Sequence, residues 1–156
     1  MKYAFPAIFQ EGDDGFSVFF PDESSSTTGG KTLKEAIEMA IDSLSLSLLY
    51  MEEQGEIIPA PSKIEDIELK DNQTIRMIYV DTEEYAKQVA EMQAREQAEK
   101  EKNLIKYYRE KAGLNIKQLS DLLGAPYATV QDWNNGRRKP PIWLQNLIAE
   151  KIETSC

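Results

Sequence analysis

The sequence predicts an α+β protein, with a β-β-β-α-β unit first, a linker helix next and an all-α region last. Three observations predict this order. The first 80 residues hold short aromatic and β-branched runs, bounded by turn residues, around one long helical pattern. Residues 82–102 are almost all strong helix formers. The last third holds four short apolar-periodic segments that Gly or Pro separates.

The opening segments are typical of strands. The runs KYAFPAIF and GFSVFF are rich in aromatic and β-branched residues, and GDDG between them is typical of a turn. Pro6 has no amide donor, so we expect it at an edge or an irregularity of the first strand. The segment SSSTTGG, residues 24–30, predicts a third, short strand that runs into a turn.

A long helix is predicted next. Thr32 and Glu35 have the spacing of a capping box, and Gly55 is placed to end the helix. Between them, apolar residues recur at intervals of three and four. The proline-punctuated loop IIPAPS follows. The run TIRMIYV, residues 74–80, predicts the final strand, at the centre of the sheet.

The segment TEEYAKQVAEMQAREQAEKEK has few large apolar residues, which favours a solvated linker helix. Tyr85, Val89 and Met92 share one face of it, and this face would pack on the front unit or on a second chain. The predicted domains are residues 1–80, residues 81–102 as the linker, and residues 103–156.

Four short helices are expected in the last domain. LIKYYREKAG ends at Gly113, and NIKQLSDLLG runs from the N-cap Asn115 to Gly124. PYATVQDWNNG has Pro126 near its start and Gly136 at its end. PIWLQNLIAEKI completes the set.

Charge is distributed unevenly along the chain. Residues 1–80 carry six cations against fifteen acids, a formal charge of −9. Residues 81–102 carry four against seven, which gives −3, and residues 103–156 carry eight against five, which gives +3. Because an acidic surface repels nucleic acid and a basic one attracts it, the two ends predict different partners.

The composition excludes several classes of enzyme. Histidine is absent, which removes Ser-His-Asp and Cys-His catalysis and His-rich zinc sites. The single cysteine, Cys156, allows no disulfide within the chain. No segment approaches the roughly 20 apolar residues that span a bilayer, and acids precede any signal-peptide pattern. We expect a cytoplasmic protein with no membrane partner, no metal and no cofactor.

The segment IKQLSDLLGAPYATVQDWNNGRRKPP resembles the helix-turn-helix of the Cro and phage-repressor class. The matching positions are Leu119, Leu122, Leu123, Gly124, Val130, Trp133 and Gly136. Gly124 would turn the chain between two short helices that share a Leu, Val and Trp core. Ile116 departs from the pattern, since such repressors often carry a polar residue there. A solvated basic end that offsets a helix dipole explains one or two cations but not this spacing.

This resemblance implies operator double-stranded DNA as a partner. The expected DNA-binding residues are Gln118, Tyr127, Ala128, Thr129, Gln131, Asp132, Arg137, Arg138 and Lys139. Gln131 would pair with adenine and Asp132 with cytosine, while the three cations would hold phosphates. Because a charge of +3 is modest, we expect a homodimer or a dimer of dimers on two half-sites.

The first 80 residues resemble the HicB family of bacterial antitoxins. The resemblance is carried by Pro-Ala-x-Phe from Pro6, Asp-Asp-Gly-Phe-Ser-Val from Asp13, Phe-Pro-Asp from Phe20, Thr-Leu-x-Glu-Ala from Thr32, and the IIPAPS loop. Fusion to a DNA-binding domain is also a habit of this family. The family's usual Leu-Pro-Gly-Cys after Phe-Pro-Asp is replaced here by ESSS, residues 23–26.

The resemblance implies a partial RNase H-like fold that is not itself a nuclease. Such antitoxins bind and block a small basic HicA-type toxin, an mRNA-cleaving ribonuclease with a double-stranded-RNA-binding-like fold, and repress their own operon. The expected toxin-binding residues are Asp13, Asp14, Phe16, Asp22 and Glu23. The four acids would face a cationic surface and speed encounter, and Phe16 and Phe19 would supply apolar anchors.

Three alternatives stay open. The four acids would also serve as solubilising turn residues. An RNase H-type nuclease would hold Mg²⁺ with carboxylates, but TIRMIYV offers no acid before Asp81, so we expect no enzyme. A ligand-sensing repressor without a toxin partner would keep the DNA-binding tail, although no Gly-rich phosphate loop supports a small-molecule site.

Overall fold

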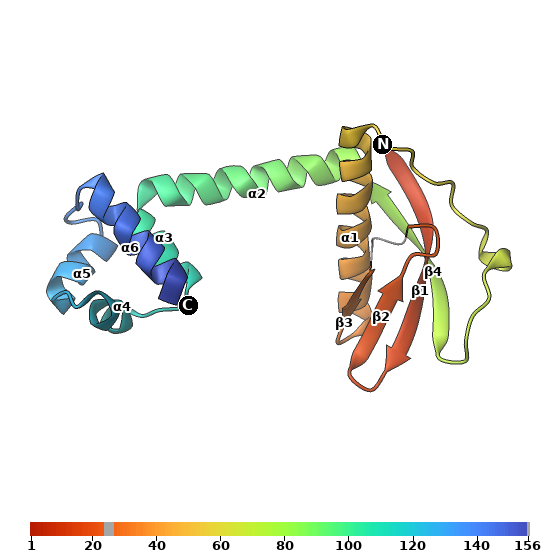
Figure 1. The fold of residues 1–156 in the computed structure, drawn as a ribbon, viewed down its shortest axis with the longest axis horizontal. Helices are drawn as coiled ribbons and strands as arrows, with labels where there is room; N and C mark the ends of the chain where they lie inside the picture. Colours follow the sequence, from red (N-terminus) through yellow and green to blue (C-terminus); the bar gives the residue numbers. More distant parts are fainter. Residues whose placement is uncertain (24–26, 156) are drawn as a thin grey trace. The chain divides into compact units, whose positions relative to one another are not determined.

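The computed structural model describes residues 1–23 and 27–155. The chain divides into two compact units, Met1–Ala90 (unit 1) and Glu91–Cys156 (unit 2). The predicted order of elements is confirmed: β-β-β-α-β, then a long helix, then four short ones (Figure 1). No helix among the described residues is long and apolar enough to cross a membrane.

Unit 1 contains one antiparallel sheet of order β3-β2-β1-β4. Its strands are β1 (Lys2–Gly12), β2 (Gly15–Phe19), β3 (Thr27–Gly30) and β4 (Gln73–Asp81). The expected third strand is confirmed from Thr27 onward. Residues 24–26, which carry most of the ESSS departure, lie outside the described residues.

The predicted central position of residues 74–80 is wrong. β4 lies at the edge of the sheet, because the long β1 pairs with β4 through residues 2–10 and with β2 through residues 8–12. β4 is nevertheless apolar because Ile78 and Val80 are buried in the core. Pro6 lies where β1 pairs with β4 alone, so its missing amide donor breaks no bond of the β1–β2 ladder.

Gly12 and Gly15 face each other across the two-residue loop of the β1–β2 hairpin. Gly15 has φ +130°, and a Cβ atom built on it would lie 2.4 Å from the carbonyl oxygen of Gly30. Only glycine fits this position without a shift of backbone, so the hairpin and β3 can approach closely.

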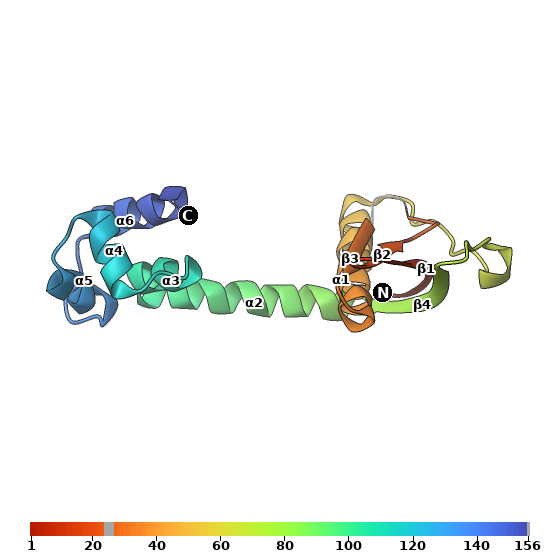
Figure 2. The ribbon, with the colours of Figure 1, turned by 90° about the horizontal axis from the view of Figure 1, so that it is seen from below.

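Helix α1 (Leu33–Gln54) begins with the predicted capping box of Thr32 and Glu35 and ends at Gly55, which has φ 67°. Its apolar face packs on the sheet. The core of unit 1 consists of Phe5, Ala7, Phe9, Val18, Phe20, Ala36, Ala40, Leu44, Leu48, Ile78 and Val80. The segment between α1 and β4, which contains η1 (Ile64–Asp66), lies on the other side of β1 and β4 from α1 (Figures 1 and 2).

Helix α2 spans Thr82–Lys102, the predicted linker segment. Thr82 is buried, and its amide donates to the carbonyl of Met1 at 2.9 Å. The Tyr85 hydroxyl donates to Asp42 of α1 at 3.0 Å. Of the two predicted partners for this face, the front unit or a second chain, Tyr85 therefore contacts the front unit. Met92 is exposed.

Unit 2 contains the four predicted short helices. They are α3 (Leu104–Lys111), α4 (Ile116–Leu123), α5 (Tyr127–Asn134) and α6 (Ile142–Ser155). Their buried core is Ile105, Leu119, Val130, Ile148 and Ile152. Leu122, Leu123 and Trp133 pack around it as the spacing predicts, and Ile116 packs there too, which accounts for an apolar residue at that position.

Candidate functional site

The turn between α4 and α5 is closed by local hydrogen bonds. Asn115 and Gln118 form a capping box at the start of α4, and Gly124 ends it with φ 63°. The hydroxyl of Ser120 donates to the carbonyl of Ala125 at 2.7 Å, one residue before the N-cap Pro126 of α5. Two short helices are thereby held against each other through Leu119 and Val130.

The outer face of α5 carries the predicted base-reading residues. Tyr127 and Ala128 are exposed, and Thr129 and Gln131 are half-buried. At about 100° per residue, Ala128, Gln131, Asp132 and Asn135 lie on the side turned away from Val130. Asn135 is exposed and was not among the predicted residues, since it stands just beyond the helix whose periodicity guided the prediction.

The basic segment folds back on the last turn of α5. The amides of Arg137 and Arg138 donate to the backbone carbonyl of Asp132 at 2.9 and 3.3 Å, after Gly136 has turned the chain with φ 71°. The side chains of Arg137 and Arg138 are 73% and 72% exposed, and Lys139 is also exposed. Arg137 and Arg138 therefore stand beside Asp132 on the outer face of α5, and Lys139 follows them in the chain.

Four predicted DNA contacts also have partners within the chain. The carboxylate of Asp132 lies 3.4 Å from Nε of Arg138 and 4.0 Å from Nη1 of Arg137. The Asp132 carboxylate therefore orients these two arginines. A cytosine amino group would compete with the arginines for this carboxylate. Gln118 uses its side-chain oxygen to accept from the Asn115 amide at 2.8 Å, although the residue is exposed.

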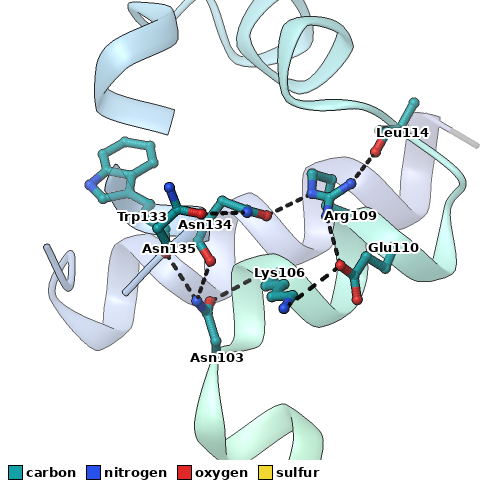
Figure 3. Close-up of polar contacts among 8 residues, drawn as sticks. All are labelled: Asn103, Lys106, Arg109, Glu110, Leu114, Trp133, Asn134 and Asn135. Carbon is teal, nitrogen blue, oxygen red and sulfur yellow. Dashed lines mark hydrogen bonds and ion pairs between the residues drawn. The ribbon is translucent and has the colours of Figure 1, made fainter. Parts of the chain in front are cut away.

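A partly buried polar network holds the end of α5 (Figure 3). Nδ2 of Asn103 donates to the carbonyls of Trp133 and Asn134 at 3.0 and 3.1 Å. Arg109 donates from Nε to the side-chain oxygen of Asn134 at 2.8 Å and from Nη1 to the carbonyl of Leu114 at 2.6 Å. Side chains of α3 thereby hold the last turn of α5, which carries the basic segment.

Sequence reasoning missed this network. Asn103 had a readable signal, since an Asn before an apolar-periodic run is a common N-cap, and it does cap α3. Arg109 gave no such signal, because a count of cations does not separate an internal arginine from a surface one. Beside the network, a hollow near Gly136 is lined by both cations and acids, among them Lys102, Lys106, Lys111, Glu99 and Glu110.

The end of α2 is attached to α3 through Tyr107. The Tyr107 hydroxyl donates to Glu96, and the ammonium groups of Lys100 and Lys111 lie 5.1 and 5.6 Å from its ring centroid. The hydrogen bond from Tyr107, followed by the contacts with Lys100, lowers the pKa of the Glu96 carboxyl. Glu96 therefore stays ionised between two lysines.

In unit 1 the predicted toxin contacts do not form one acidic edge. Asp13 and Asp14 occupy the β1–β2 turn and are exposed, whereas Asp22 and Glu23 follow the other end of β2. A five-residue strand separates the pairs, which is roughly 17 Å at the usual rise per residue. Phe16 is half-buried and packs against the core.

Asp22 and Glu23 are also engaged within the fold. The carboxylate of Asp22 accepts from the amide of Ser62 at 2.9 Å and from its hydroxyl, which ties the end of β2 to the loop after α1. Glu23 is only 4% exposed. Glu23 is thus buried and Asp22 is half-buried and bonded to Ser62, so Asp13 and Asp14 are the more accessible pair; the toxin contact itself stays a prediction for all four acids.

These four acids do not converge on a common point, as the alternative of a carboxylate-bound Mg²⁺ would require. Within residues 1–23 and 27–155, no group of three or more His, Cys, Asp or Glu side chains is arranged to hold a metal ion.

Comparisons with known proteins bear on unit 1. "Antitoxin HicB 2" of Photorhabdus laumondii is 39% identical over 62 residues, which are 40% of this chain and 43% of that protein. The chain thus matches less than half the length of this curated relative. A structure titled "Toxin-Antitoxin complex from Streptococcus pneumoniae" is similar with a TM-score of 0.51 and 28% identity, over 55% of this chain and 73% of that one.

A second structure, titled "HicA3 and HicB3 toxin-antitoxin complex", gives a TM-score of 0.43 at 21% identity, over 51% of this chain and 99% of that one. The family described as "HicB_like antitoxin of bacterial toxin-antitoxin system" matches residues 5–99. That range is more than half of the chain and includes nearly all of unit 1. Its members are antitoxins, in agreement with the expectation of a protein that is not an enzyme. The chain therefore belongs to the HicB-like antitoxin family.

Proposed function

We propose that this protein binds and neutralises a HicA-type mRNA ribonuclease and represses its own operon by binding operator DNA as a dimer. Family membership over residues 5–99 is the observation that carries the first half. The similar Streptococcus pneumoniae structure is, by its title, a complex of a toxin with an antitoxin, which supports the same assignment. Residues 1–80 are assigned to the toxin and residues 103–156 to DNA, with residues 81–102 as the linker.

Electrostatics supports the toxin assignment. A formal charge of −9 over residues 1–80 suits a cationic, RNA-binding partner, because opposite charge raises the rate of encounter and disfavours wrong partners. Asp13 and Asp14 are accessible at the hairpin turn for this role. The toxin loses its route to RNA when an anionic surface covers its cationic one.

The geometry of α5 supports the DNA assignment. A short helix with an exposed outer face, packed on a second helix and followed at once by exposed cations, is the arrangement that enters a major groove. Gln131 would read a base edge, and Arg137, Arg138 and Lys139 would hold phosphates on either side. Hydrogen bonds from Asn103 and Arg109 hold the end of α5 beside this face.

A dimer requires a surface for a second copy, and exposed apolar side chains support α6 as the candidate. Ile142, Trp143 and Leu147 are exposed large apolar residues at one end of this helix. The charged residues of α6, Glu150, Lys151 and Glu153, all follow this apolar segment, so two copies can meet through it without bringing charged side chains of α6 into the contact. Sedimentation of a Trp143→Gln, Leu147→Gln variant tests this contact, and an unchanged molecular mass would exclude it.

The DNA assignment is tested by the double variant Arg137→Ala, Arg138→Ala on DNA from the protein's own promoter. Loss of two phosphate contacts should lower the slope of log K against log salt by about 1.8 for each copy. The control Lys31→Ala, Lys34→Ala removes the same charge from unit 1. Unchanged DNA affinity in the arginine variant would count against the assignment, and so would equal losses in both variants.

The base-reading role is tested separately with Gln131→Ala. We expect this variant to change which operator sequence is preferred rather than the salt dependence. Uniform loss across operator sequences would refute a role for Gln131 in base recognition.

The toxin assignment is tested by co-expression with the small protein encoded beside this gene. Growth arrest by that protein alone, and rescue by this chain, support the antitoxin. A ligand-sensing repressor with no toxin partner would give no rescue, and a nuclease would degrade RNA by itself with Mg²⁺.

A further inference from the structure

Helix α1 exposes large apolar side chains on the side turned away from its sheet. Met39, Leu46 and Tyr50 are 46%, 57% and 56% exposed. At about 100° per residue they lie within about 40° of one another around the helix axis, and roughly 140° from the buried Leu44. A helix that covers a sheet on one side ordinarily carries polar residues on the other.

The three side chains stay exposed although α2 begins beside α1. Tyr85 of α2 reaches α1 through its hydrogen bond to Asp42, which lies next to this stripe of side chains. That contact leaves Leu46 and Tyr50 more than half exposed. The helix therefore has a second apolar face, and exposed apolar groups gathered on one face are typical of an interaction surface.

The charges around these side chains are of one sign. Glu35, Asp42 and Glu53 lie within about 60° of them around the axis. Lys34 is the only cation in the α1 sequence, and its ammonium group lies 3.8 Å from Glu38, off this face. We refer to Met39, Leu46 and Tyr50 with Glu35, Asp42 and Glu53 as the α1 ridge.

We propose that the α1 ridge is the surface on which unit 1 docks the basic toxin. The inference rests on the proposed function and names the surface that performs it. An apolar centre with an acidic rim fits a partner whose apolar patch is surrounded by lysine and arginine, because desolvated apolar contact supplies affinity and the rim supplies orientation. Tyr50 is of the residue type most often found at the energetic centre of such contacts.

Charge excludes a second copy of this chain as the main occupant. Two ridges that faced each other would bring together three carboxylates from each copy, and the one cation of α1, Lys34, lies off this face and is paired with Glu38. Like charges at a desolvated interface are unfavourable, whereas the cations of a basic partner would pair with all of them.

The double variant Leu46→Gln, Tyr50→Gln tests the proposal in the full-length protein. Because both side chains are more than half exposed, the fold should tolerate the change, and circular dichroism and DNA affinity report on this. We expect affinity for the protein encoded beside this gene to fall by at least about 30-fold. The matched control is Ile57→Gln, since Ile57 is 92% exposed but lies outside the α1 ridge. The affinity of this variant for the neighbouring gene's protein should equal that of the wild type.

A charge variant tests the rim. Glu53→Lys should slow association with the toxin and reduce the salt dependence of the rate, whereas Glu65→Lys in η1, with the same change in charge, should have less effect. Equal effects of the two variants would mean that the overall charge of unit 1 speeds association. The acidic residues of the α1 ridge would then make no specific contact with the toxin.

The outcomes separate the inference from the function on which it rests. Toxin bound by the wild type and equally well by the double variant would overturn the α1 ridge and leave the antitoxin function standing. A wild type that binds no such protein would overturn both. Loss of self-association with unchanged toxin affinity would make the α1 ridge a contact between copies and overturn the proposal.

Discussion

Asn134 shows what a single buried polar residue does in unit 2. Its side-chain oxygen accepts from Nε of Arg109, whose side chain is only 14% exposed. Asn134→Ala should destabilise unit 2 by about 2 kcal/mol, because a nearly buried guanidinium loses an acceptor. Urea unfolding followed by tryptophan fluorescence measures this, since both tryptophans, Trp133 and Trp143, lie in unit 2. Lys106→Ala, which removes only an exposed ion pair, should cost no more than about 0.5 kcal/mol.

Gly15 and Gly12 form a matched pair in the β1–β2 hairpin. Gly15→Ala places a Cβ atom 2.4 Å from the Gly30 carbonyl at φ +130°, whereas the nearest atom to a Cβ on Gly12 is 3.8 Å away. We expect Gly15→Ala to destabilise unit 1 by more than about 1 kcal/mol and Gly12→Ala to cost less. Thermal unfolding followed by circular dichroism compares the two variants. Equal melting temperatures would show that position 15 does not need glycine for its backbone angle or for the close approach to Gly30.

At the residue scale, sequence predicted the kind of side chain better than its surroundings. Asp13 and Asp14 lie in an exposed turn because turn chemistry is local. Asp22 was grouped with them because it also follows a strand, but its partner Ser62 is 40 residues away and no local pattern indicates it. The exposed Met39, Leu46 and Tyr50 of α1 were given no role from the sequence, because a helical repeat alone does not indicate a second apolar face.

At the element scale, helix ends were the most predictable feature. The start and end of α1 were predicted from Thr32, Glu35 and Gly55, because a cap is formed by residues adjacent in sequence. The position of β4 was predicted wrongly, because the order of strands depends on pairing between distant segments. A strand buried through Ile78 and Val80 resembles a central strand when only its composition is known.

The junction of β1 with the end of α1 depends on pH. The Tyr3 hydroxyl donates to Glu52 at 2.7 Å; burial, followed by this hydrogen bond, raises the pKa of Tyr3 to about 12. Burial alone would raise the pKa of Glu52, but hydrogen bonds from Tyr3 and Thr82 and the amino group of Met1 outweigh it, and the pKa lies below its ordinary 4.5. A lowered carboxyl pKa stabilises the fold above 4.5, and this contribution is lost as pH falls through the folded pKa.

Glu52→Gln should therefore lower the melting temperature of unit 1 at pH 7, by the equivalent of about 1–2 kcal/mol for a lost charged hydrogen bond. The difference from the wild type should shrink as pH falls below 4.5. Glu53→Gln, at an exposed neighbouring position, should show neither effect. Melting curves by circular dichroism from pH 7 to pH 3 test this, and a difference that does not depend on pH would argue against the ionised Glu52 as the cause.

At the scale of the whole molecule, the chain combines two cores that share no residue. The core of unit 1 is built from its strands and α1, and the core of unit 2 from α3, α4, α5 and α6. The formal charge changes sign between them, from −9 over residues 1–80 to +3 over residues 103–156. The change of charge was readable from the sequence, because counting charges needs no tertiary information, whereas the predicted boundaries at residues 80 and 103 stay predictions.

Separate cores predict that each unit unfolds on its own. Leu44→Ala removes a fully buried side chain from unit 1, and Leu119→Ala does the same in unit 2; each should cost about 2–5 kcal/mol in its own unit. Because both tryptophans lie in unit 2, tryptophan fluorescence should report a shifted urea midpoint for Leu119→Ala and the wild-type midpoint for Leu44→Ala. Far-ultraviolet circular dichroism should detect both. A fluorescence midpoint that Leu44→Ala lowers as much as Leu119→Ala would mean that α2 transmits unfolding between the units. Toxin binding and DNA binding would then be lost together in one unfolding transition.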